Sequence, residues 1–212
     1  MTLEHDHDAD DQAQEHQHDH GHDEHDHGGH EHVDYATAVG LYRADKDEYF
    51  RESHGSPIPE SERESFTGLP YFDVNEGLRF ERLTLQPYTG TEPSSFQIPT
   101  SDGKLRDAER AGTFELELAG ARHRLTGYRF ADGDSESVFL PFLDATSGSE
   151  TYGAGRYLDL DPESDGTYTI DFNLAYHPSC VYDPRFSCPL TPPENRLPIR
   201  IEAGERLPPA GS

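Results

Sequence analysis

The residues best suited to binding or catalysis gather between positions 144 and 196. Gly148, Gly153 and Gly155 form a turn-rich loop that runs directly into Arg156. Backbone N–H groups of a glycine loop and the fork of an arginine together suit a phosphate or a carboxylate. The alternative is an internal ion pair between Arg156 and one of the aspartates in which this stretch is rich. Both interpretations stay open on the sequence alone.

Two acids follow the arginine on segments that are expected to be strands. Asp159 lies in 156–160 and Asp171 in 167–172, and the turn-forming residues 161–166 between them predict a hairpin. If the carboxylates face each other, they can share a proton or hold a divalent cation; the register, which alternation does not determine, decides this. The predicted site for a small polar or anionic ligand consists of Tyr152, Gly153, Gly155, Arg156, Asp159, Asp171, Asn173, Tyr176, His177 and Glu194.

The two cysteines are separated by seven residues in a proline-rich loop. Cys180 and Cys188 fit neither a redox C-x-x-C motif nor a zinc ribbon. With His177 they offer three zinc ligands, and Asp183 is a weak fourth. Without a metal, the pair is either a disulfide that pins the loop or two free thiols buried among aromatic residues.

Two common catalytic classes have no motif here. The glycine loop is not G-x-x-x-x-G-K-[ST], which argues against a nucleotide-binding loop. Ser147 and Ser149 are not in a G-x-S-x-G elbow, so a serine hydrolase has little support.

The N-terminal 32 residues are rich in histidine and acids, and they contain few apolar residues. Such a segment buries too little surface to offset chain entropy, so we expect disorder. Histidines at every second position place imidazoles on one side of an extended chain, where they suit Zn, Ni, Cu or Co. The alternative is a solvated tail that binds metal adventitiously. The candidate ligands are His5, His7, His16, His18, His20, His22, His25, His27, His30 and His32.

The charge balance of the chain restricts its partners. Asp and Glu number 42 against 17 Lys and Arg, for a net charge of −25. Phosphate contacts need Lys and Arg, so we expect neither nucleic acid nor anionic membrane as a partner. Scarce lysine beside abundant acids is typical of salt-adapted proteomes such as those of haloarchaea. The sequence shows no apolar run long enough to span a bilayer and no signal-peptide pattern, and we therefore expect a cytoplasmic protein.

The hydrophobic pattern predicts a mainly β domain over residues 33–207, barrel- or sandwich-like, with one N-terminal helix and a frayed end at 208–212. The helix is expected over 33–53, with an apolar stripe of Tyr35, Ala38, Val39, Tyr42, Lys46, Tyr49 and Phe50 facing the core. Short alternating segments between turn signals favour strands. These are 78–85, with a bulge at Glu81-Arg82, then 113–118 and 122–130 as a hairpin, 137–142, 156–160, 167–172 and 197–202.

Three motifs in series resemble an uncharacterised prokaryotic family known only as a domain of unknown function. They are T-Y-G-A-G-R-Y-L-D-L, D-F-N-L-A-Y-H-P-S-C-V-Y and C-P-L-T-P-P-E-N-R-L-P-I. The resemblance runs from about Tyr42 to Arg206 and leaves out the histidine-rich tail. The family pattern has Asn where this chain has His177. The resemblance implies a domain and the place of a site, and no activity.

Three functional hypotheses remain. The first is a domain that binds, or acts on, a small polar or anionic ligand; flavin binding in a split barrel enters here by fold analogy alone. The second is metal storage or delivery by the tail, with the domain as a docking module. The third is a structural or interaction domain without catalysis.

Overall fold

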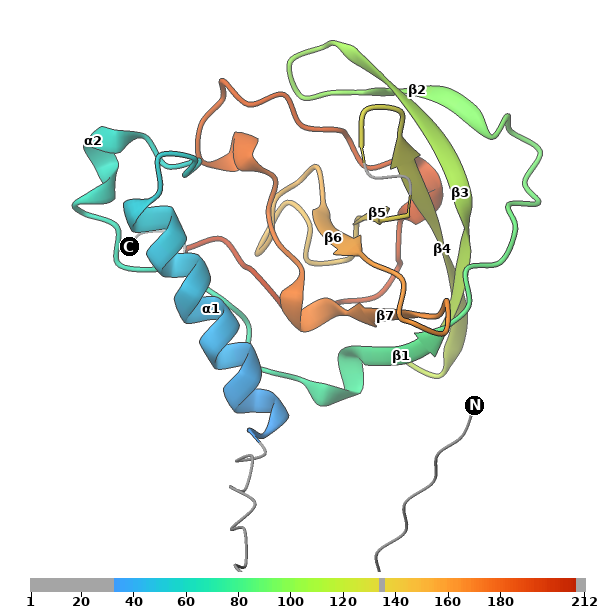
Figure 1. The fold of residues 1–212 in the computed structure, drawn as a ribbon, viewed down its shortest axis with the longest axis horizontal. Coiled ribbons are helices and arrows are strands. Elements are labelled where there is room, and N and C mark those ends of the chain that lie inside the picture. Colours follow the sequence, from blue (N-terminus) through green and yellow to red (C-terminus); the bar gives the residue numbers. More distant parts are fainter. Residues whose placement is uncertain (1–32, 134–135, 209–212) are drawn as a thin grey trace, which may run out of the picture. The chain divides into compact units, whose positions relative to one another are not determined.

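The computed structural model describes residues 33–133 and 136–208 of the chain. This part is mainly β, as predicted, with a five-stranded antiparallel sheet in the order β2–β3–β4–β5–β6 and a two-stranded sheet of β1 and β7 (Figure 1). Neither sheet closes on itself within these ranges, so the structure is sandwich-like and not a barrel. The histidine-rich tail and residues 209–212 lie outside the described residues, and metal binding by the tail stays a prediction.

The large sheet is a meander with one long hairpin. Its strands are β2 (Ser95–Pro99), β3 (Leu105–Leu118), β4 (Ala121–Phe130), β5 (Val138–Phe142) and β6 (Arg156–Leu160). The predicted hairpin is confirmed, because Leu118 pairs with Ala121 across a turn in which Ala119 and Gly120 have positive φ values of 51° and 74°. Phe114 and Leu116 point into the core, as the alternation predicts.

The small sheet pairs β1 (Arg79–Leu83) with β7 (Tyr168–Asp171). The expected bulge in β1 is confirmed, since the register shifts between Phe80 and Leu83 and Arg82 has a φ of 57°. The predicted hairpin of 156–160 with 167–172 is wrong, because β6 pairs with β5 and β7 pairs with β1. The residues between the two strands carry the chain from one sheet to the other.

The core lies between the two sheets. Phe114 of β3 packs edge-on against Tyr168 of β7, with ring centroids 5.4 Å apart. Phe142 of β5 packs against Phe172, just after β7, at 5.1 Å. Burial of these large aromatic side chains on both facing surfaces is what makes a sandwich stable.

The helix α1 (Tyr35–Glu52) is capped at its N-terminus by Asp34, whose carboxylate accepts the N–H of Thr37 at 3.0 Å. The predicted apolar stripe is largely wrong. Only Val39 and Phe50 of α1 are buried, whereas Tyr42 and Tyr49 are 42% and 48% exposed.

Polar side chains instead dock α1 on the domain. Arg43 donates to the carbonyl of Phe72 at 3.1 Å, and Asp47 accepts the N–H of Leu69 at 2.9 Å. The periodicity of apolar residues cannot identify this contact face of the helix, because the residues that make the contacts are charged.

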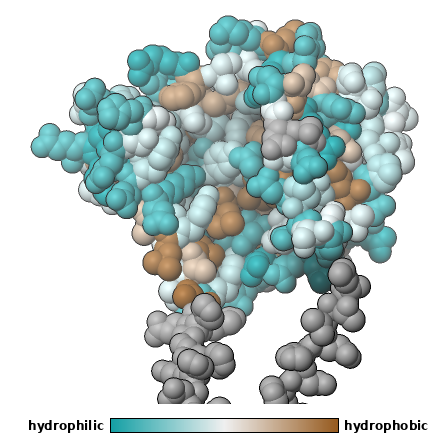
Figure 2. Space-filling model, in the orientation of Figure 1, coloured by the Kyte–Doolittle hydropathy of each residue, from teal (hydrophilic) through white to brown (hydrophobic). Residues whose placement is uncertain are grey.

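The remaining elements are short. They are α2 (Glu60–Arg63) and four 3₁₀ turns, η1 (Glu76–Leu78), η2 (Phe172–Leu174), η3 (Ser179–Val181) and η4 (Pro193–Asn195). The expected strand over 197–202 is extended chain without a sheet partner of its own, apart from backbone bonds such as that from Leu197 to Leu143 at 2.7 Å. No helix in the described ranges is long and apolar enough to cross a membrane. Hydrophilic residues predominate on the face in Figure 2.

Asn195 holds the C-terminal segment against the large sheet. Its side chain is fully buried, and its amide accepts from the N–H of Thr126 and donates to the carbonyls of Thr126 and Pro141, each at 2.7 Å. These bonds connect η4 to β4 and β5.

We therefore expect Asn195→Ala to lower the free energy of unfolding by about 3 kcal/mol or more, since three buried backbone groups lose their partner. Chemical denaturation measures this. The exposed neighbour serves as control, and Arg196→Ala should change stability by less than about 0.5 kcal/mol. Equal effects of the two substitutions would contradict the role assigned to Asn195.

Candidate functional site

One candidate site is a cavity of about 350 Å³ beside β4, β5 and β6. A ligand site of this size is common in proteins, where an apolar or aromatic lining with a few polar groups is typical. Hydrophobic and aromatic lining comes from Tyr128, Phe130, Phe139, Tyr157, Tyr176, Pro178, Cys188 and Pro189; polar lining comes from Arg106, Arg129, Ser137, Asp159, Ser179 and Ser187, and Gly133 completes it. We call this space the aromatic cavity.

Aromatic rings in mutual contact form one wall of the cavity. Phe139 lies 5.2 Å from Phe130 and 4.7 Å from Tyr157, and Tyr157 lies 5.8 Å from Tyr176. Strand pairing places the first three on neighbouring strands, and a backbone bridge between Tyr157 and Tyr176 adds the fourth. Each ring supports the next, so the wall is held in place before any ligand arrives.

Asp159 and Tyr176 are the two predicted site residues that line this cavity. The Tyr176 hydroxyl donates to the Asp159 carboxylate at 2.5 Å. Burial and then the nearby Asp159 charge raise the pKa of Tyr176. The hydroxyl therefore stays protonated, and the pair presents a carboxylate oriented by a neutral donor.

Two arginines bring positive charge to the cavity. Arg106 lies over the ring of Phe130 at 3.7 Å and pairs with Asp132 at 2.8 Å. Arg129 has a buried Nε without a hydrogen-bond partner among the described residues, and its Nη2 lies 3.5 Å from the carbonyl of Glu136. Other buried nitrogens share this property, but Arg129 is the one that lines the aromatic cavity.

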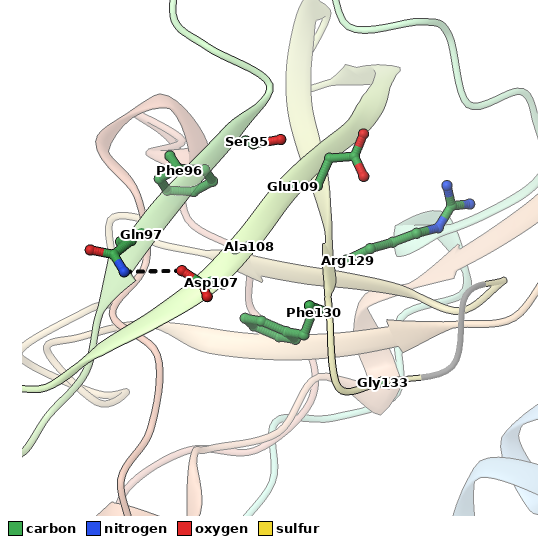
Figure 3. Close-up of a pocket in the computed structure, with 10 residues that line it drawn as sticks. Ser95, Phe96, Gln97, Asp107, Ala108, Glu109, Arg129, Phe130 and Gly133 are labelled. Carbon is green, nitrogen blue, oxygen red and sulfur yellow. Dashed lines mark hydrogen bonds between the residues drawn. The ribbon is translucent and has the colours of Figure 1, made fainter.

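A larger hollow of about 760 Å³ adjoins the aromatic cavity and shares Arg129, Phe130 and Gly133 with it. Figure 3 shows its floor on β2, β3 and β4, where Gln97 donates to Asp107 at 3.0 Å. Asp107 and Glu109 make this hollow acidic, and an anionic ligand is therefore better accommodated on the aromatic side. A third hollow, of about 460 Å³, lies between α2 and η3 and has a mainly apolar lining.

Arg156 does not face any of these spaces. Its side chain is fully buried and donates to the carbonyls of Ile201 at 2.8 Å, Glu205 at 3.2 Å and Ala203. Its Nη2 lies 3.4 Å from Asp144. Of the two interpretations of this arginine, the internal ion pair is the one that the structure contains.

His177 belongs to the same buried region. Its Nε2 accepts the N–H of Tyr152 at 3.3 Å, and its backbone N–H donates to Glu205 at 2.7 Å. Lys46 of α1 completes the group, 2.5 Å from the other oxygen of Glu205. Burial, followed by the charges of Arg156 and Lys46, lowers the pKa of His177 to about 3.

The remaining predicted residues are also engaged within the protein. The Asp171 carboxylate accepts from the hydroxyl of Tyr35 at 2.7 Å, and Asn173 donates to the carbonyl of Asn75 at 2.9 Å. Asp171 lies opposite Arg79 and Asp159 opposite Phe139, so the two acids are not the facing pair that the predicted hairpin required.

Glu194 accepts from Arg110 and from the hydroxyl of Tyr128, both at 2.9 Å. Local backbone geometry also explains one of the loop glycines. Gly155 has a φ of 106°, and a Cβ there would lie 2.6 Å from the carbonyl oxygen of Phe142, whereas Gly153 is exposed.

Both cysteines are free thiols, and the described residues contain no group of three or more His, Cys, Asp or Glu side chains placed to hold a metal ion. The zinc grouping of His177 with Cys180 and Cys188 is therefore not formed. Phe130, Phe139 and Arg129 line the cavity but are not among the site residues predicted from the sequence. Their alternation predicts strands, but only the sheet pairing brings them to one cavity.

We expect Arg156→Ala to destabilise the fold by at least about 3 kcal/mol, because it strands the buried Asp144 carboxylate and three carbonyls. Chemical denaturation checks this against Arg200→Ala, an exposed arginine paired with Glu150 and Glu202, whose loss should cost less than about 1 kcal/mol. A stable Arg156→Ala protein would return this arginine to the candidates for ligand binding.

His177 predicts a loss of stability in acid. Its folded pKa lies below the ordinary value of about 6.5, so the unfolded chain takes up the proton first. The stability it contributes is complete above pH 6.5 and falls as the pH drops toward 3. Between pH 7.5 and 5, the protein should lose about 2 kcal/mol more than His177→Asn does. His54→Asn, at an exposed histidine, should follow the parent protein; identical pH profiles for all three would refute this.

Comparisons with known proteins agree with the sequence motifs. Residues 64–206 match the model of a family described as "Protein of unknown function (DUF1684)". An uncharacterized protein of Haloarcula marismortui, solved by solution NMR, is 40% identical with a TM-score of 0.60, over 81% of this chain and 93% of that chain. No curated protein matches significantly. The family match covers well over half of the chain, and the chain therefore belongs to the DUF1684 family.

Proposed function

We propose that the domain binds a small molecule that carries a planar ring and an anionic group, in the aromatic cavity. The observation that carries the proposal is that a preformed aromatic wall and Arg129 line the same cavity, and that the Arg129 Nε has no hydrogen-bond partner within the described chain. Rings of Phe139, Tyr157 and Tyr176 offer stacking and edge contacts to a planar ligand. Arginine offers a carboxylate or phosphate two parallel hydrogen bonds.

The Asp159–Tyr176 pair adds polarity at a defined point of the same space. Its carboxylate accepts a hydrogen bond from a hydroxyl or amine substituent on the ligand, while the arginines take the anionic end. A ligand with both features has two kinds of polar partner in one cavity, and this would fix its orientation.

The proposal is for binding and stops short of a reaction. The thiol in the cavity wall, Cys188, has its pKa raised to about 11, chiefly by burial, so it is protonated and a poor nucleophile at neutral pH. Tyr176 is likewise held in its protonated form.

The test uses benzoate and 4-hydroxybenzoate as probes in titrations followed by amide chemical shifts of the full chain. Benzoate should shift resonances of β4, β5 and β6, whereas acetate, which lacks the ring, and benzyl alcohol, which lacks the charge, should bind more weakly. Arg129→Gln should reduce benzoate affinity about tenfold or more, because a charge-assisted bond is lost.

Arg122→Gln is the matched control. It removes the same charge from an exposed position on the same strand, outside the cavity, and should leave the affinity unchanged. Benzoate shifts confined to other regions, or equal losses in the two variants, would overturn the proposal.

A further inference from the structure

The two cysteines of the chain lie in contact. The backbone N–H of Cys180, in η3, donates to the sulfur of Cys188 at 3.3 Å. The Cys188 sulfur thus rests against the residue that carries the other thiol. The two thiols also share a side-chain hydrogen bond, which places their sulfurs within hydrogen-bond distance of each other. Rotation about the Cα–Cβ bonds changes the separation of the sulfurs, and a disulfide needs them about 2 Å apart.

The electrostatics of the pair agree with this proximity. Burial is the main reason that the pKa of Cys188 is raised to about 11, and the neighbouring Cys180 thiol raises it further, against a lowering by the backbone hydrogen bond. Cys188 is buried and Cys180 is only partly so. An oxidant in solution therefore meets Cys180 first.

Each cysteine is fastened to a different part of the fold. Cys188 exchanges hydrogen bonds with Ser101, at the turn after β2, through its N–H at 3.1 Å and its carbonyl at 2.8 Å. Cys180 precedes Tyr182, whose hydroxyl donates to Glu205 at 3.0 Å and whose ring packs on Phe50 of α1 at 5.2 Å. A bond between the sulfurs would join these two anchored regions across the exposed residues 184–187.

We propose that Cys180 and Cys188 form a reversible disulfide that fastens the wall of the aromatic cavity to which Cys188 belongs. The co-reactant is a low-molecular-weight disulfide. The Cys180 thiolate attacks one of its sulfurs and releases one small thiol, which leaves a mixed disulfide on Cys180. Cys188 then gives up its proton and attacks the Cys180 sulfur, which releases the second small thiol. Two protein thiols are oxidised and one small disulfide is reduced to two thiols.

This inference is independent of the ligand proposed above, because it depends on the geometry of the two cysteines alone. The bond would close a short loop, and such a constraint stabilises chiefly by restricting the unfolded chain. A disulfide that suits the native geometry should therefore raise the melting temperature of the reduced protein by roughly 5–10 °C.

The experiment equilibrates the full-length protein with defined ratios of reduced and oxidised glutathione, quenches with acid and labels free thiols with a maleimide under denaturing conditions. With two cysteines in the chain, intact mass gives a direct count. Both labels should disappear together as the ratio becomes oxidising, with a mass lower by two hydrogens, no covalent dimer, and the higher melting temperature. Reduction should restore both labels.

Single serine variants test the order of attack. Cys188→Ser should accumulate a mixed disulfide with glutathione on Cys180, whereas Cys180→Ser should keep its buried thiol free at the same ratios; the reverse pattern would contradict the assignment. Two labels retained in oxidised glutathione alone, stable mixed disulfides on both cysteines of the parent protein, or disulfide-linked dimers would each overturn the proposed bond.

Discussion

The buried guanidinium of Arg156 is the interaction on which the C-terminal third of the structure depends. Removing an arginine from water is costly unless its donors find acceptors, and here three backbone carbonyls and Asp144 supply them. Asp144 in turn accepts the N–H of Ile201 at 2.7 Å. The residues from 201 to 205 form no strand. Side chains of β6 and of the loop before it therefore satisfy their backbone groups, as a neighbouring strand would in a sheet.

The same constraint extends to α1 through Glu205. This fully buried carboxylate is held by Lys46, by the backbone N–H of His177 and by the hydroxyl of Tyr182. The helix α1 is therefore held on the domain by ionic contacts as well as by apolar contacts. A buried ion pair contributes little net stability, but removing one of its partners leaves an uncompensated buried charge. The contact of Lys46 with Glu205 therefore constrains the position of α1 together with the buried side chains of Val39 and Phe50.

Sequence patterns predict the local geometry of the strands well, but they do not predict which strands pair with each other. The hairpin of β3 and β4 was predictable because clean alternation around Phe114 and Leu116 met a tight turn at Gly120. The same kind of alternation placed β6 and β7 correctly, yet it could not say that they join different sheets. Alternation identifies which face of a strand is buried, and pairing depends on contacts far away in the chain. The cavity was missed for this reason, since Phe139 and Tyr157 become neighbours only through the pairing of β5 with β6.

The sequence predicts a ligand site from the dense polar residues between 144 and 196, but many of these residues stabilise the fold instead. Most of its members, such as Asp171, Asn173 and Glu194, satisfy one another or nearby backbone groups. A polar group that is already satisfied inside the fold would have to break those bonds to hold a ligand, and this costs as much as the new bond contributes. A ligand is better held by groups that still lack a partner, and the Arg129 Nε is such a group on a residue that lines the cavity beside aromatic rings in mutual contact. The distinction rests on the partners of each side chain, which composition does not contain. The stretch from 144 to 196 therefore supplies both buried scaffold residues and part of the lining of the candidate cavity, whose other residues come mainly from β3, β4 and β5.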